Sequence, residues 1–136
     1  MSYAISAALQ SAVFAALSAD IGVSGAVGDA IYDAVPAGAL PSLYISLGPE
    51  TVRAADDKTG SGAVHLFVVS IITDVPGFSA AKAAAGAVCD VLHDGDLALS
   101  RGRLVSLRFE KARAGKIDKG LGRMIDLTFR ARVEDQ

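Results

Sequence analysis

Residues 63–73 read AVHLFVVSIIT, and no other segment of the chain predicts a β-strand so strongly. β-Branched and aromatic residues dominate it, as is typical of strands. Apolar side chains occur at both the odd and the even positions of the segment. Because successive side chains of a strand point to opposite faces of a sheet, this pattern predicts a central strand that is covered on both sides.

Two later segments, 104–111 and 123–133, predict strands with one buried face and one face in water. In the first, Val105, Leu107 and Phe109 alternate with polar residues. In the second, the residues that alternate with an apolar series are Asp126, Thr128, Arg130 and Arg132. Residues 115–120, with two glycines and two lysines, predict the tip of a hairpin that joins these strands.

Two segments predict helices. In residues 2–19 the apolar side chains of Ile5, Leu9, Val13 and Leu17 recur at every fourth position, with Ser2 as N-cap and a stop at residues 20–22. The second helix is expected from about Ser79 to Asp94-Gly95. Gly22, Gly25 and Gly28 predict a loop after the first helix. Residues 42–47 predict a further strand that ends at Gly48-Pro49, and residues 52–55 are expected to continue the sheet after that break.

The order of elements is therefore helix, two or three strands, helix and β-hairpin. It favours an α+β fold in which two main helices pack on an antiparallel sheet. The 136 residues fit a single domain, residues 1–136. Aromatic residues are only 6% and Trp is absent, so the core is expected to consist of small aliphatic side chains. Such a core leaves room for stabilisation by assembly with other copies.

Composition also restricts the class of protein. No segment offers the roughly 20 continuous apolar residues of a membrane span, and the N-terminus does not resemble a signal peptide. Cys89 is the only cysteine, which excludes an internal disulfide and fits a reducing cytoplasm. We expect no membrane partner.

Charge is distributed unevenly along the chain. Residues 1–100 contain 3 basic and 10 acidic side chains, a net charge of −7, whereas residues 101–136 contain 10 basic and 5 acidic ones, a net charge of +5. Such an asymmetry can guide nucleic acid or can guide one copy onto the next. A solvated basic hairpin is the simpler interpretation.

Catalytic motifs are weak. Residues 57–60 read DKTG, which matches the phosphorylation loop of P-type ATPases, but those are large membrane pumps with a separate nucleotide domain. His65 and His93 lack partners at the spacing of zinc ligands, and we expect His65 in the core or in an interface and His93 at the end of its helix. Asp90, Asp94 and Asp96 lack the spacing of a calcium loop. We therefore expect no enzyme, no metal site and no cofactor.

Five stretches together resemble the tail terminator, or tail-completion, proteins of phages and of alphaproteobacterial gene transfer agents such as the Rhodobacter type. They are SYAISAALQSAVFAAL (2–17), GDAIYDAVPAGALPSLYISLG (28–48), RAADDKTGSGAVHLFVVSI (53–71), AVCDVLHDGDLALSRGRLVSLRF (87–109) and RMIDLTFRARVED (123–135). The likeness covers nearly the whole chain in order, although no single motif is decisive.

The resemblance implies a structural role. Six copies would form a ring on the head-proximal end of the tail tube, stop its growth and present a surface to the stopper of the neck, and DNA would pass through the central hole without sequence-specific binding. The expected partners are thus the chain itself, the tube protein and the neck protein. The chain would be present in the bacterial cytoplasm during assembly and afterwards at the head–tail joint of the particle.

Two other functions stay open: another head–tail joining subunit of the neck, or a nucleic-acid-binding module. Against the latter, no aromatic residues interleave the basic cluster. For assembly we expect contacts from the polar loop 54–62 and from the charged face of the C-terminal hairpin. The residues selected are Arg53, Asp56, Asp57, Lys58, Arg108, Lys111, Arg130 and Arg132.

Overall fold

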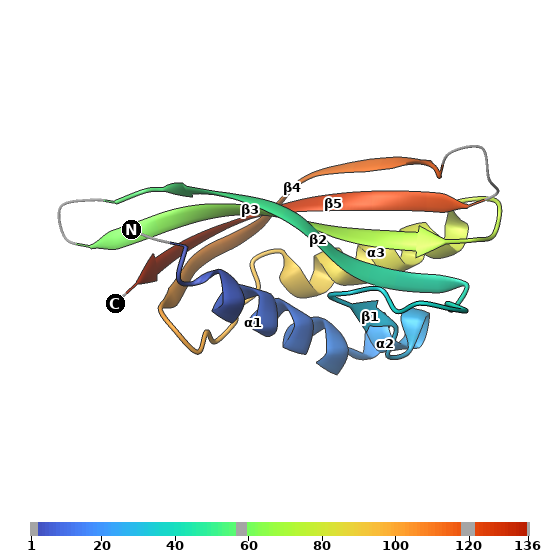
Figure 1. Cartoon of the computed structure of the whole chain (residues 1–136), viewed down its shortest axis with the longest axis horizontal. Coiled ribbons are helices and arrows are strands. Elements are labelled where there is room, and N and C mark those ends of the chain that lie inside the picture. Colours follow the sequence, from blue (N-terminus) through green and yellow to red (C-terminus); the bar gives the residue numbers. More distant parts are fainter. Residues whose placement is uncertain (1–2, 57–59, 118–121, 136) are drawn as a thin grey trace.

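The computed structural model describes residues 3–56, 60–117 and 122–135. Its elements, in chain order, are α1 (Ser6–Ala19), α2 (Ile21–Val27), β1 (Ile31–Tyr32), β2 (Leu43–Ala54), β3 (Ser61–Thr73), α3 (Ser79–Leu92), β4 (Arg103–Lys116) and β5 (Arg123–Asp135). Figure 1 shows a long twisted sheet with the helices gathered on one side of it. The predicted α+β class is confirmed.

The five strands are ordered β1-β2-β3-β5-β4. Every neighbouring pair is antiparallel except β1 and β2, which pair in parallel over two residues. The strand that the sequence placed at the centre, β3, is indeed the middle strand. β4 is a long edge strand, and β1 covers only a small part of the other edge, since its partners on β2 are Ile45 and Ser46.

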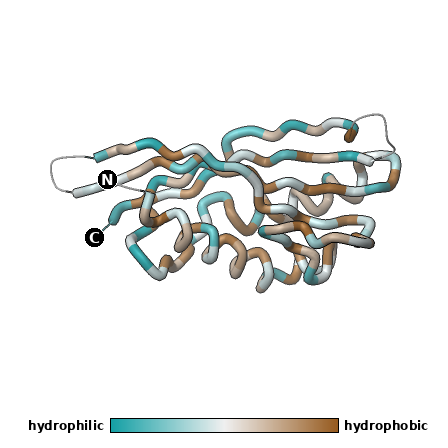
Figure 2. The backbone as a smooth tube through the Cα atoms, viewed as in Figure 1, coloured by the Kyte–Doolittle hydropathy of each residue, from teal (hydrophilic) through white to brown (hydrophobic). Residues whose placement is uncertain are grey.

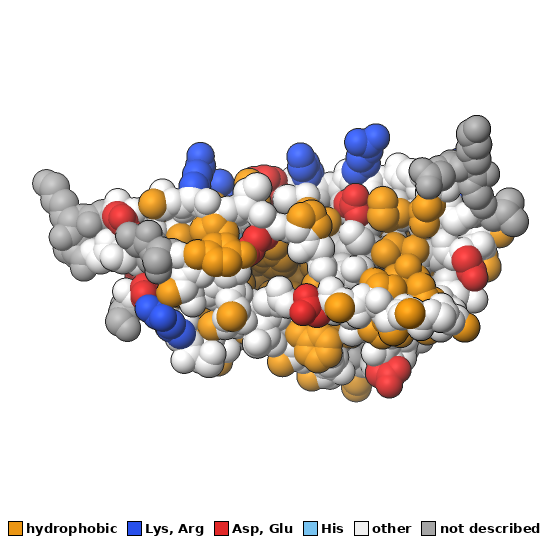
Figure 3. Space-filling model, in the orientation of Figure 1, with side chains coloured by type: hydrophobic (Ala, Val, Ile, Leu, Met, Phe, Trp, Pro, Cys, Tyr) orange, Lys and Arg blue, Asp and Glu red, His pale blue; other side chains and the backbone are white. Residues whose placement is uncertain are grey.

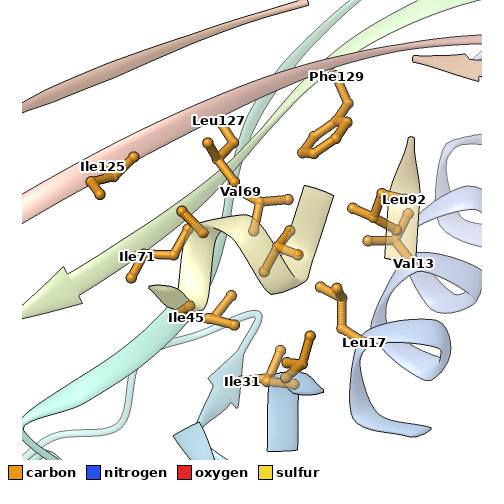
Figure 4. Packing of buried hydrophobic residues seen from close by; sticks show 14 of the residues in the cluster. Val13, Leu17, Ile31, Ile45, Val69, Ile71, Leu92, Ile125, Leu127 and Phe129 are labelled. Carbon is orange, nitrogen blue, oxygen red and sulfur yellow. The ribbon is translucent and has the colours of Figure 1, made fainter. Parts of the chain in front are cut away.

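The core lies between the sheet and the helices. The odd-numbered residues of β3 and β5 point into it, as the alternation in β5 predicted, and Phe67 stacks on Phe129 with ring centroids 5.7 Å apart. Figure 4 shows Val69, Ile71, Leu127 and Phe129 of the sheet facing Val13 and Leu17 of α1 and Leu92 of α3. Small aliphatic side chains make up most of this core, as the composition predicted.

The second face of β3 is not covered by a helix in the described part of the chain (Figure 1). The expectation of a strand covered on both sides is therefore wrong for the isolated chain. Leu66, Val68 and Ile72 lie half-buried on this open face, and Val64 is only 4% exposed. A strand that is covered on both faces and a strand with one open apolar face have the same pattern of apolar residues. The sequence alone therefore could not distinguish them.

The glycine-rich segment after α1 is helical, not a loop. Asp20 ends α1 and caps α2, because its Oδ2 accepts a hydrogen bond from the backbone N–H of Val23 at 2.9 Å. Gly22 lies close to Ala87 of α3, where small residues permit close packing of two helices. Tertiary packing thus outweighs the low helix propensity of glycine.

β-Bulges shift the alternation in two strands. In β2 the register shifts between Leu47 and Glu50, so the predicted break at Gly48-Pro49 is a bulge within one continuous strand. In β4 the register shifts on either side of Leu107 and Phe109. As a result Val105, expected on the buried face, is 41% exposed and Leu104 takes its place.

Candidate assembly surface

Five of the cations selected from the sequence lie on the open face of the sheet. Arg53 of β2 pairs with Val64, which in turn pairs with Arg132 of β5. Arg130 of β5 pairs with Arg108 of β4, and Lys111 follows along β4 opposite Thr128. Figure 3 shows Lys and Arg side chains projecting from the upper side of the molecule, which is the side of the sheet away from the helices. We call this group the cationic face: Arg53, Arg108, Lys111, Arg130 and Arg132.

The centre of the cationic face is a pair of like charges. Arg108 and Arg130 stand directly opposite each other on neighbouring strands, an arrangement that destabilises an isolated sheet. Neither arginine, nor Lys111 beside them, forms an ion pair within residues 3–56, 60–117 and 122–135. These three cations are thus available to an external anion or acidic surface.

Arg101 and Arg103 beside this face, and Arg132 within it, already have partners in the chain. Arg101 donates two hydrogen bonds to Asp135, at 3.1 and 2.9 Å, and this pair raises the pKa of Arg101 and lowers that of Asp135. Arg103 forms an ion pair with Glu134 through a hydrogen bond from its Nη2. Arg132 donates from Nη2 to the carbonyl oxygen of Ala55 at 3.2 Å, which fixes its orientation. Arg113, opposite Asp126, also belongs to this surface and was not selected from the sequence.

An apolar line crosses the same face along β3. Val64, Leu66, Val68 and Ile72 form it, and Figure 2 shows hydrophobic residues alternating with hydrophilic ones along the upper strands. The line lies between the cations of β5 and β4 on one side and Arg53 of β2 on the other. An apolar centre with a charged rim is the composition of protein–protein interfaces.

The loop between β2 and β3 closes with a backbone hydrogen bond from the N–H of Ala55 to the carbonyl oxygen of Gly62, at 2.9 Å. Asp56 is exposed, and its Oδ1 accepts from the N–H of Gly62 at 3.1 Å. Asp57 and Lys58, which the sequence also selected, lie outside the described residues. Asp56 therefore shapes the end of the hairpin beside the cationic face.

Acidic side chains are concentrated in the helical layer and its connections. Asp29, Asp33, Asp74, Asp90, Asp94 and Asp96 are exposed there. Lys82 is the basic residue of the described helices. The asymmetry between the two parts of the sequence thus becomes an asymmetry between the two sides of the fold, with a basic sheet face and an acidic helical side.

A partly buried polar network that the sequence did not reveal joins the start of α1 to the sheet. Glu50 accepts hydrogen bonds from the hydroxyls of Tyr3 and Ser6, and its Oε2 lies 3.2 Å from Nδ1 of the fully buried His65. Burial raises the pKa of Glu50, but the hydrogen bonds from Ser6, Tyr3 and His65 outweigh this effect and leave the pKa below its ordinary value. The expected core position of His65 is confirmed.

The Ser6 hydroxyl donates to the Glu50 carboxylate and not to His65, and the lowered pKa of Glu50 makes this carboxylate a weak base toward Ser6. A pocket of about 370 Å³ adjoins the network, between α1 and the bulge of β2. Its lining residues are Tyr3, Leu9, Gln10, Val13, Leu47, Gly48, Pro49, Glu50, Phe67 and Val68.

His93 caps the C-terminus of α3, as expected, and its side chain has a further structural role. Its Nδ1 accepts a hydrogen bond at 3.0 Å from the backbone N–H of Phe109, next to a bulge of β4.

Among the described residues, no three His, Cys, Asp or Glu side chains form a metal-binding group. No single described helix is long and apolar enough to cross a membrane; α1 and α2 meet these criteria only jointly, and a bend of 79° separates them.

Comparisons with known proteins match this fold over nearly its full length. A family model described as tail completion protein gp17 matches residues 11–134. A chain in a solved structure entitled "Virion of native gene transfer agent (GTA) particle" is 59% identical, superposes with a TM-score of 0.93, and aligns over 98% of this chain and 99% of its own length. No protein of curated function matches. The chain therefore belongs to the gp17 family of tail completion proteins.

Proposed function

We propose that this protein is a non-enzymatic tail terminator, which forms a closed ring on the head-proximal end of a phage-like tail tube, stops tube growth and joins the tail to the neck. The observation that carries the proposal is the near-complete alignment with a chain of a gene transfer agent virion, together with the tail completion family. A hexamer is the copy number we expect. The protein would assemble in the bacterial cytoplasm and remain in the particle.

The surface supports assembly in a ring. A head-to-tail ring requires two unlike surfaces on each copy, joined by a rotation that closes. The basic sheet face and the acidic helical side are two such surfaces. Exposed ion pairs contribute only about 0–1 kcal/mol each, so charge would select the partner and the register, while burial of apolar surface would supply most of the affinity.

Binding of DNA through the cationic face is the competing interpretation. Basic residues neutralise phosphates, but proteins that bind nucleic acid without sequence preference usually add aromatic side chains on which bases stack. The neighbours of Arg130 and Arg132 on β3 are Leu66 and Val64, and the neighbour of Lys111 is Thr128. Aliphatic neighbours favour a protein partner, and we propose that DNA passes through the ring without sequence-specific contacts.

The variant Arg108→Glu separates assembly from folding. It replaces a like-charged cross-strand pair with an opposite-charged one, so the isolated chain should become more stable by about 0.2–1 kcal/mol. If the cationic face contacts an acidic partner, the same change should impair the joining of the chain to tails. The measurement is the amount of this chain in purified particles, with urea unfolding of the isolated variant in parallel.

Arg101→Gln is the matched control, because Arg101 is an arginine already paired within the chain. It should leave incorporation into tails unchanged. If Arg108→Glu joins tails normally but retains less duplex DNA in a filter-binding assay over a salt series, the cationic face binds DNA and not a protein partner. Tails assembled without this chain should be longer and unjoined to heads; tails of normal length joined to heads would contradict the terminator function.

A further inference from the structure

α1 lacks charge on every side. From Ser6 to Ala19 it contains no Asp, Glu, Lys or Arg, although one side of it is exposed. A surface helix normally carries charged residues on its outer side, and a helix that is apolar all round is normally buried. We call the exposed side the α1 face, formed by Ala7, Gln10, Ser11, Phe14, Ala15 and Ser18. Phe14, the largest apolar side chain of the α1 face, is 42% exposed.

A groove with a largely apolar lining lies between α3 and β4. Two adjoining hollows, of about 470 and 290 Å³, share Cys89 and Phe109. The core-facing side chains of β4 beyond Phe109 are alanines, which leave this space unfilled. Asp90 and His93 line the larger hollow together with Cys89 and Phe109, and Lys82 lines the smaller one. The rest of the lining is apolar or glycine: Ala85, Gly86, Ala112, Ala114, Ile125 and Leu127.

The α1 face and the groove lie at opposite edges of the sheet. Gln10, one turn before Phe14 on the same side of α1, lines the pocket beside the bulge of β2. β4, which forms one wall of the groove, is the edge strand on the other side of β3 and β5. In Figure 1, α1 and β2 are drawn strongly and the more distant α3 and β4 more faintly. Copies placed side by side would therefore bring one surface to the other.

We propose that the α1 face of each copy packs into the α3–β4 groove of the next copy, with Phe14 against Cys89 and Phe109. This inference rests on the proposed ring and names the residues of its repeating contact. Phe14 supplies one large apolar side chain, and the groove supplies small ones that make room for it. The α1 face carries no charge, and the groove carries Lys82, Asp90 and His93 beside its apolar lining, so burial costs little desolvation where these three side chains keep contact with water.

A second copy fits these observations better than other occupants. The contact is heterologous, since the α1 face and the groove are different surfaces, and this is the type of contact that a closed ring repeats. Asp29 and Asp33 are exposed after α2 and can pair with Lys82 of the groove, whereas Asp90 of the groove requires a different neighbour. A tube protein or a lipid surface would use only one of the two surfaces.

The single native cysteine permits a direct test. The variant Phe14→Cys places a thiol on the α1 face, and Cys89 already lies in the groove. A disulfide requires Cα atoms within about 7 Å, so oxidation reports this contact specifically. Burial raises the pKa of the Cys89 thiol, so the oxidation is carried out at mildly alkaline pH. Purified particles that contain the variant are oxidised and analysed on non-reducing gels.

The expected result is a ladder of dimers, trimers and higher species, because each copy supplies one thiol to each neighbour. The double variant Phe14→Cys with Cys89→Ser should give monomers only, because the thiol of the groove is missing. If Phe14→Cys does not assemble into particles, Ser18→Cys, one turn further along the α1 face, takes its place. Dimers that persist without Cys89 would indicate an α1–α1 contact and overturn the proposal. A ring visible in the particles without any cross-linked ladder from either variant would also overturn it, while leaving the proposed ring intact.

Phe14→Asp supplies the complementary measurement. Phe14 is partly exposed, so the isolated chain should fold, whereas incorporation into tails should fall about tenfold or more. Val75→Asp is the matched control, because Val75 is exposed to 43% but lies in the turn before α3. Unchanged incorporation of Phe14→Asp would contradict the contact. Flotation of the isolated wild-type chain with anionic phospholipid vesicles, lost in Phe14→Asp, would assign the α1 face to a lipid surface instead.

Discussion

Replacing Glu50 with glutamine should destabilise the chain and change how its stability depends on pH. In the native protein the Glu50 carboxylate accepts hydrogen bonds from the hydroxyls of Tyr3 and Ser6 and from His65. Hydrogen bonds to a charged group contribute about 1.5–3 kcal/mol each, against about 0.5–1.5 kcal/mol for neutral ones. Because the Glu50 side chain is 18% exposed, we expect a total loss of about 2 kcal/mol at neutral pH.

The effect should disappear in acid. The pKa of Glu50 is lower in the folded chain than its ordinary value of 4.5, so its contribution is complete above pH 4.5 and is lost as the pH falls through the folded-state pKa. Urea unfolding at neutral pH should show a midpoint lower by about 1 M in the variant, at a slope of about 2 kcal/mol per M. Glu110→Gln, on the exposed part of β4, is the control and should change little. Equal midpoints of Glu50→Gln and wild type at neutral pH, or a difference that stays constant into acid, would refute the reasoning.

Two further predictions concern the hairpin loop and two glycines. Replacing residues 56–61 with Asn-Gly should keep the chain folded, since β2 and β3 can pair through a short turn, but should impair tail completion; infectious or DNA-delivering particles of normal tail length would contradict a role of the loop. Gly102→Ala should destabilise the chain by about 1–3 kcal/mol, because φ is +73° and a Cβ would lie 2.6 Å from the carbonyl oxygen of Glu134. Gly86→Ala, where a Cβ meets no atom within 4 Å, should instead stabilise α3 by up to about 1 kcal/mol; thermal unfolding of the pair measures both changes.

Local patterns predicted those parts of the fold that depend on neighbouring residues in sequence. The alternation in β5 gave its buried face correctly from Ile125 to Val133. It also placed Arg130 and Arg132 on the opposite face. The β-bulges could not be predicted from the sequence, because no particular residue type marks the extra residue that a bulge inserts into a strand. Val105 was therefore assigned to the wrong face, and the inward position of Glu50 was missed.

The candidate site depends on pairing between distant segments. Arg53 joins the cationic face only because β2 and β5 both pair with β3 at Val64. The Glu50 network requires the bulge of β2 and the docking of the start of α1 on the same side of the sheet. The signal that was present, a strand with apolar residues on both faces, predicted the covered face of β3 correctly but could not show that no helix of the described residues covers the other face.

Electron microscopy of intact particles tests the central claim most directly. The account predicts a closed ring of this chain, with six copies, at the head-proximal end of the tail tube, and neighbouring copies related by a single repeated rotation. The α1 face of each copy should lie against the α3–β4 groove of the next. Particles whose density at that end of the tube contains no ring of this subunit would contradict the proposed function.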